Sequence, residues 1–179
     1  GLDVTTGAAN TFVGAETAAN VTTGLDNVMM GKAAGVTTQT TSGSVFIGRS
    51  AGNAVTTGNQ NIGIGKTALG GAATTGDNNI AIGTNAADAL TSGQLGVYIG
   101  KNAGGALTTA KENVVIGHTA FQSANSSENF NTVIGFAAGR ERDGGDGLTA
   151  IGYAALKNLQ SQEGNVAVGH NALDANISG

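Results

Sequence analysis

The chain has 179 residues with a formal net charge of −4, and 31 are glycine, none is proline or cysteine and only 4 % are aromatic. The lack of cysteine excludes a disulfide framework and a thiolate metal site, and the acidic balance argues against a partner such as nucleic acid. No apolar run approaches the ~20 residues of a membrane-spanning helix, so we expect no membrane insertion.

A glycine recurs along the whole chain in steps of 17 residues, two of which are lengthened to 18. These glycines are Gly14, Gly31, Gly48, Gly65, Gly83, Gly100, Gly117, Gly135, Gly152 and Gly169. A fixed period of this size is typical of a solenoid, in which each unit stacks on the next. Residues 1–179 are therefore predicted to form a single repeat array of about ten coils, on the order of 50 Å long at the spacing of paired strands.

The three residues before each glycine predict a short β-strand. The first rank is β-branched throughout: Thr11, Val28, Val45, Ile62, Ile80, Val97, Val114, Thr132, Thr149 and Val166. The last rank is apolar throughout: Val13, Met30, Ile47, Ile64, Ile82, Ile99, Ile116, Ile134, Ile151 and Val168. Residues two apart on a strand share a face, so we expect both ranks to point into the core.

The middle rank is then expected to point outward, although it is almost entirely apolar. It comprises Phe12, Met29, Phe46, Gly63, Ala81, Tyr98, Val115, Val133, Ala150 and Ala167. Strands that are apolar on both faces are usually covered on both, so the sequence favours a homo-oligomer with another copy as the cover. The predicted interface residues are Phe12, Met29, Phe46, Tyr98, Val115 and Val133. Isolated exposed apolar residues are the alternative.

The rest of each unit contains small, apolar and turn-forming positions. Alanine lies three residues after nearly every glycine, as in Ala34 and Ala51, which indicates that the backbone turns where no larger side chain fits. A further apolar residue four positions later predicts a second, less regular strand: Val21, Val55, Ala72, Leu90, Leu107, Ala124 and Leu159. Turns such as Thr22–Gly24 end the unit. The two 18-residue steps are expected to add one loop residue each, near 71–73 and 123–128.

Asparagine lies four residues before the glycine in seven of ten units: Asn10, Asn27, Asn61, Asn79, Asn113, Asn131 and Asn165. Stacked asparagine side chains can form a hydrogen-bonded ladder or cap turns. Both interpretations are structural, and they are favoured over a ligand-binding role.

Two units, 79–83 and 165–169, resemble the head repeats of trimeric autotransporter adhesins. Unit 131–135, Asn-Thr-Val-Ile-Gly, is even more similar to the shaft repeats of phage tail fibres and related bacterial tail-fibre proteins. The resemblance covers nearly the whole chain, although the autotransporter period is shorter. It implies a left-handed parallel β-roll with two short strands per coil, three chains side by side, and an extracellular location on a virion tail fibre or a bacterial surface, where such proteins bind host glycan or matrix.

The residue after each glycine is a candidate binding column. Lys32, Arg49, Lys66 and Lys101 would form a basic stripe able to meet an anionic glycan. Solvated charges, or ion pairs with acids such as Asp26, Asp77 and Glu112, are the favoured alternative. His118 and His170 lie in the same column three coils apart, too distant to share a metal ion.

The dense charge cluster 140–147 is expected to be a solvated loop rather than a calcium site, because its acidic pattern does not recur. We expect no enzyme and no cofactor, since no acid–base or nucleophilic arrangement is present. With no capping repeat visible, the sequence favours a slice of a longer shaft: a structural or adhesive segment of a trimeric fibre. A self-assembling filament subunit and, less favoured, an ice-binding solenoid are the alternatives.

Overall fold

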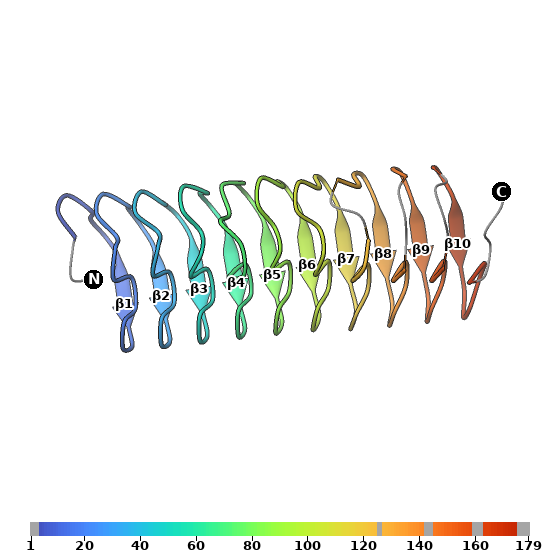
Figure 1. Ribbon diagram of the computed structural model, residues 1–179, viewed down its shortest axis with the longest axis horizontal. Helices are drawn as coiled ribbons and strands as arrows, with labels where there is room; N and C mark the ends of the chain where they lie inside the picture. Colours follow the sequence, from blue (N-terminus) through green and yellow to red (C-terminus); the bar gives the residue numbers. More distant parts are fainter. Residues whose placement is uncertain (1–3, 125–126, 142–144, 159–162, 175–179) are drawn as a thin grey trace.

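The computed structural model is a straight parallel β-solenoid, and the structure describes residues 4–124, 127–141, 145–158 and 163–174. One sheet contains ten parallel strands in sequence order, each paired with the next (Figure 1). The strands are β1 (Thr11–Val13), β2 (Val28–Met30), β3 (Val45–Ile47), β4 (Ile62–Ile64), β5 (Ile80–Ile82), β6 (Val97–Ile99), β7 (Val114–Ile116), β8 (Thr132–Ile134), β9 (Thr149–Ile151) and β10 (Val166–Val168). The predicted all-β solenoid and the position of its strand in every unit are confirmed.

The glycine that closes each strand is required by both conformation and space. Its φ lies between +126° and +141° in all ten coils, a region that L-residues rarely adopt. A Cβ at nine of the ten positions would also overlap the backbone of the glycine in the next coil, as at Gly48, where it would lie 2.6 Å from the carbonyl oxygen of Gly65. These stacked glycines therefore set the period of the array.

The sheet stays in register through both 18-residue steps. Ile62 pairs with Ile80, and Val114 pairs with Thr132, so the additional residue lies outside the strands. At the start of the first long unit, the Gly52 amide bonds to the Ala68 carbonyl 16 residues on, the same interval as from Gly35 to Ala51. The Thr56 amide then bonds to the Thr74 carbonyl 18 residues on, one more than the interval of 17 from Thr22 to Gln39. The additional residue is thus accommodated between Ala68 and Thr74, as predicted. The second step falls partly on residues 125–126, outside the described residues.

The prediction of a second strand in each coil is wrong for the described residues. The return wall uses alternating left-handed residues instead, such as Ala33 (φ +57°) and Gly35 (φ +59°). It is still hydrogen-bonded between coils, because the Ala33 amide donates to Ala15 of the previous coil and the Gly35 amide donates to Ala51 of the next. The predicted inward residues of this wall are buried at Val21, Val55, Leu90, Leu107 and Ala124, whereas Ala72 is half-buried and Leu159 lies outside the described residues.

The prediction of which strand residues face the core is wrong. The middle rank is the core: Met29, Phe46, Ala81, Tyr98, Val115, Val133 and Ala150 are all fully buried. The first and last ranks are half-buried along the array and point outward. Both faces of the strand are apolar, so alternation alone does not identify the core. The first and last ranks, which are more uniform in size, are predicted to form the core. The middle rank, whose residues range from Gly63 to Tyr98, occupies it instead.

The size of each middle-rank side chain is related to that of the residue six positions later, which lies opposite it on the return wall. Phe46 faces Gly52, and Tyr98 faces Gly104, where a Cβ would overlap the aromatic ring. In the fourth coil the order is reversed, since Gly63 lies opposite the buried Leu69. In these coils the large residue of the pair is therefore exchanged between the two walls, which keeps their core volumes similar.

The asparagine column forms the predicted ladder. The Asn79 side chain donates to the carbonyl oxygen of Gly93 at 2.9 Å and accepts from the backbone amide of Gly96 at 3.0 Å. Its amide nitrogen also lies 3.2 Å from the Asn61 side-chain oxygen. Asn27, Asn61, Asn79, Asn113 and Asn131 are all buried, and their polar atoms are used to hold neighbouring turns together.

Candidate interaction surfaces

The outer face of the sheet is a largely apolar surface formed by the first and last ranks, with threonine in the first rank at Thr11, Thr132 and Thr149. In strands β3 to β9 every residue of these ranks is half-buried, because each side chain is flanked by its equivalents in the coils on both sides. At the array ends the exposure rises, to 53 % at Val13 and 66 % at Val168. Ile64, Ile82, Ile99 and Ile116 form a continuous row of isoleucine in the last rank. This surface is called the isoleucine face below.

The six residues predicted as an oligomer interface do not lie on it. Met29, Phe46, Tyr98, Val115 and Val133 are fully buried within their own coil, and Phe12 packs against the same core. The outward-facing apolar residues that another copy could cover are therefore those of the first and last ranks.

The predicted basic stripe is exposed and stacked. Lys32, Arg49, Lys66 and Lys101 are all solvent-exposed, and the Ser50 amide donates to the Lys32 carbonyl, which holds these turns one above the other. None of these four side chains makes an ion pair within the described part of the chain, where Arg140–Glu141 at 3.6 Å is the single pair found. Asp77 is instead used locally, accepting from the Asn59 amide at 2.6 Å. Binding of an anionic glycan by this stripe stays a prediction.

The same column becomes aromatic towards the C-terminal end. His118, Phe136, Tyr153 and His170 stack face to face, with ring centroids 5.3, 5.2 and 4.9 Å apart in succession. Phe136 and Tyr153 are 45 % and 50 % exposed. Because each ring covers the face of the next, the stack presents ring edges to solvent and stabilises adjacent coils. Two rings separate the histidines, consistent with the expectation that they do not share a metal.

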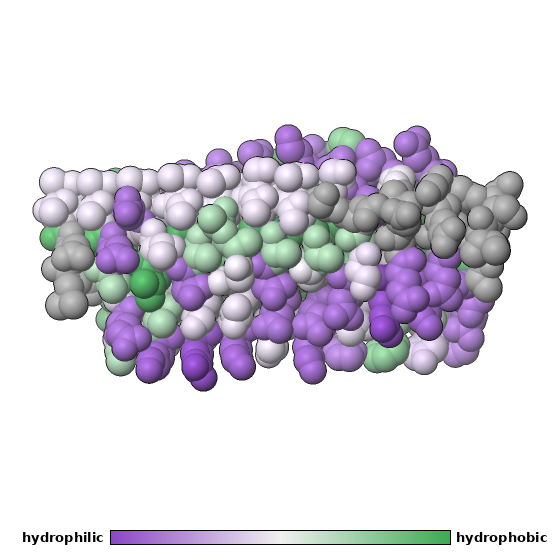
Figure 2. Space-filling view, viewed as in Figure 1, coloured by the Kyte–Doolittle hydropathy of each residue, from purple (hydrophilic) through white to green (hydrophobic). Residues whose placement is uncertain are grey.

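The threonine turns line one long edge of the rod with a single exposed rank. Thr23, Thr57 and Thr75 are exposed, whereas their neighbours Thr22 and Thr56 are half-buried and donate to carbonyl oxygens of the next coil. A flat two-rank array of free hydroxyls is therefore not formed. In Figure 2 hydrophilic residues cover much of the side shown, and a narrow, weakly hydrophobic band runs along its middle.

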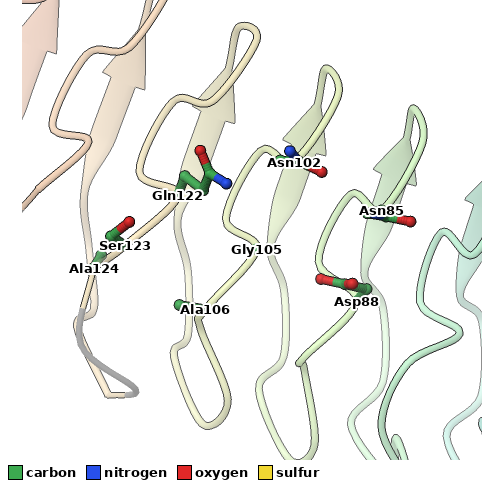
Figure 3. Close-up of a pocket in the computed structure, with 8 residues that line it drawn as sticks. All are labelled: Asn85, Asp88, Asn102, Gly105, Ala106, Gln122, Ser123 and Ala124. Atoms are coloured by element: carbon green, nitrogen blue, oxygen red, sulfur yellow. The ribbon is translucent and has the colours of Figure 1, made fainter.

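A polar groove crosses three coils on the return wall. Asp88, Gly105 and Gln122 occupy the same position in successive coils, and the glycine leaves a gap between the two longer side chains (Figure 3). The remaining lining residues are Asn85, Asn102, Ala106, Ser123 and Ala124, and the groove has a volume of about 710 Å³. Burial raises the pKa of the Asp88 carboxyl, and hydrogen bonds from the backbone amides of Asp88 and Ala89 oppose this in part.

The described residues contain no group of three or more histidine, cysteine or acidic side chains that could hold a metal ion. The predicted charged loop 140–147 is described only in part, with residues 142–144 outside the described set. Its Asp146 has a structural role, accepting from the backbone amide of Asn129 at 2.7 Å. No helix in the described part of the chain is long and apolar enough to cross a membrane.

Comparison with known proteins gives no family for this chain. No family model, no curated protein and no solved structure matches it. The geometry of these surfaces is therefore the basis for assigning a function.

Proposed function

We propose that this chain is a structural segment of an extracellular homo-oligomeric fibre, in which copies pack side by side through the isoleucine face. The observation that carries the proposal is a last rank that is apolar in all ten strands beside a first rank that is valine or isoleucine in seven of them, both left partly exposed by the chain itself. Burying each half-exposed isoleucine or valine more fully would contribute on the order of 1 kcal/mol. Repetition in every coil multiplies that contribution along the rod.

Another copy of the chain suits this face better than an unrelated partner. The apolar side chains recur at the ~4.8 Å spacing of parallel strands, so a well-packed partner needs the same interval over the same length. An identical solenoid provides it without additional features. Its face is also flat, which allows side chains of two or three copies to interdigitate.

The number of chains follows from the resemblance to fibre repeats and not from the area of the face. Ten strands of three residues present roughly 40 Å by 10 Å, or about 400 Å², which is within the ~300–600 Å² of the largest apolar patch on a typical monomer. In a trimer around a common axis each face contacts two neighbours, and this is the arrangement that the resemblance to fibre repeats implies. Presentation of a glycan- or matrix-binding element by the fibre is part of the same proposal.

The test is the mass in solution, measured by light scattering across a dilution series. We expect a stable mass of three chains. The double variant Ile82→Lys/Ile116→Lys places two charges on the isoleucine face and is expected to be monomeric, with unchanged circular dichroism. The matched control Thr57→Lys/Thr75→Lys adds the same charge on the exposed threonine edge and keeps the wild-type mass.

A wild-type monomer at every concentration would contradict the proposal, as would a double variant that keeps the wild-type mass. A mass that grows continuously with concentration would favour a filament formed through the strand edges instead.

A further inference from the structure

We propose that the groove around Gly105 binds a neutral, hydroxyl-rich ligand, a sugar ring of a glycan. The site is distinct from the isoleucine face, and the inference does not depend on oligomer formation. It rests on two independent observations: a glycine that neither the backbone nor the packing requires, and three side-chain amides around it that make no hydrogen bond within the described structure.

Gly105 is unlike the other described glycines. Its φ lies outside the left-handed region, and a Cβ there would meet nothing closer than the Asn102 carbonyl oxygen at 3.4 Å. Every other described glycine either has a positive φ or would place a Cβ within 3.3 Å of a neighbouring atom. Most residues could therefore occupy position 105 without strain. The structural consequence of glycine here is that the groove stays open.

The side chains that border the gap keep their hydrogen-bonding capacity. The side-chain amides of Asn85, Asn102 and Gln122 make no hydrogen bond within the described structure, in contrast to the buried asparagines of the ladder. Each amide has two donor hydrogens and an acceptor oxygen. The Asp88 carboxylate adds a second type of acceptor, with one oxygen 3.7 Å from where a Cβ of Gly105 would lie.

This set of groups selects the chemistry of the ligand. Neighbouring hydroxyls of a sugar both donate and accept, which matches adjacent amide and carboxylate groups. The carboxylate disfavours an anion, and a single carboxylate is a poor set of ligands for calcium, which prefers several acidic oxygens. The methyl groups of Ala106 and Ala124 provide a small apolar surface for ring carbons. A volume of about 710 Å³ is within the ~300–1,000 Å³ range of small-molecule sites.

The test is saturation-transfer difference NMR with the methyl glycosides of glucose, galactose, mannose and N-acetylglucosamine. We expect at least one to bind, and Gly105→Phe to weaken that binding by about tenfold or more, because the side chain fills the gap. Val36→Phe is the matched control, since Val36 occupies the equivalent position four coils away, and it should leave the affinity unchanged.

Circular dichroism and the thermal midpoint verify that Gly105→Phe folds. Should it fold poorly, Gly105→Ser and Asp88→Asn provide smaller changes, and both are expected to weaken binding. The Ile82→Lys/Ile116→Lys variant should bind the glycoside as wild type does, so the two proposals can fail separately. The inference is overturned if none of the glycosides binds, if binding survives Gly105→Phe, or if glycerol competes as well as the glycoside.

Discussion

The Tyr98 ring fills the space that Gly96 leaves open, two residues earlier in the same coil. A Cβ at Gly96 would lie 2.6 Å from the Tyr98 hydroxyl oxygen. Position 96 belongs to the asparagine column, and the Gly96 amide still donates to the Asn79 side chain. The tyrosine thus replaces the missing asparagine side chain and interrupts the ladder only locally.

This relationship predicts a strong coupling between positions 96 and 98. Gly96→Asn alone should destabilise the fold by about 2–4 kcal/mol, because the new side chain overlaps the tyrosine ring. Combining it with Tyr98→Val recreates the Asn113–Val115 arrangement of the next coil and should recover most of that loss. Urea denaturation of both single variants and the double variant gives the coupling energy. Additive effects would contradict the steric argument.

Tyr98 also predicts a loss of stability in alkali. Burial raises the pKa of its hydroxyl from the usual 10.0 to about 12, and the Asn113 side chain offsets this only in part. The unfolded chain therefore loses this proton at lower pH than the folded chain does. Stability from this group is complete below pH ~10 and is lost as the pH rises towards ~12, by about 3 kcal/mol in total.

The measurement is urea denaturation at a series of pH values from ~9 to ~12, compared with Tyr98→Phe. The phenylalanine variant keeps the ring and removes the buried hydroxyl, which has no well-formed hydrogen bond. It should match wild type at neutral pH within about 1 kcal/mol and show a smaller alkaline loss. Parallel pH curves for the two proteins would show that another group is responsible.

The exchange of core volume between the two walls predicts that the Phe46–Gly52 pair of the third coil can be reversed. Gly52→Leu should be destabilising by about 2–4 kcal/mol, since its Cβ already lies 2.5 Å from Phe46 Cγ. Phe46→Gly should cost a similar amount or more through the cavity that it leaves. The double variant reproduces the Gly63–Leu69 pair and should be more stable than either single variant. Thermal unfolding monitored by circular dichroism measures this, and a double variant worse than both would contradict it.

Much of this fold could be predicted from the sequence, because its periodic features are local. The closing glycine, the three-residue strand and the asparagine ladder each follow from the chemistry of one position. The face of each strand that points to the core could not be predicted, since Ile62 and Ile64 on the outer face are as apolar as any core residue. The pairing of Phe46 with Gly52 becomes visible only when the core face is known.

The candidate surfaces were predictable to different degrees. The aromatic stack was present in the sequence, because Phe136 and Tyr153 lie in the same column as His118 and His170. The groove was not, since the sequence does not distinguish Gly105 from the many glycines that turns require. Only its ordinary φ and the space around it do so.

The asparagine ladder predicts a large effect from a single buried amide. Asn79→Ala removes the acceptor for the Gly96 amide and the donor to the Gly93 carbonyl, and both groups are left without a partner inside the protein. Each unsatisfied buried group costs about 1–3 kcal/mol, so the expected loss for the two groups is roughly 2–6 kcal/mol. Asn20→Ala, at an exposed position of the return wall, is the control and should change stability by less than about 0.5 kcal/mol. Equal denaturation midpoints for the two variants would mean that water replaces the lost hydrogen bonds. Because the other buried asparagines of this column also bond to neighbouring coils, a large loss at Asn79 would also show that the ladder, and not only the sheet, keeps the coils stacked.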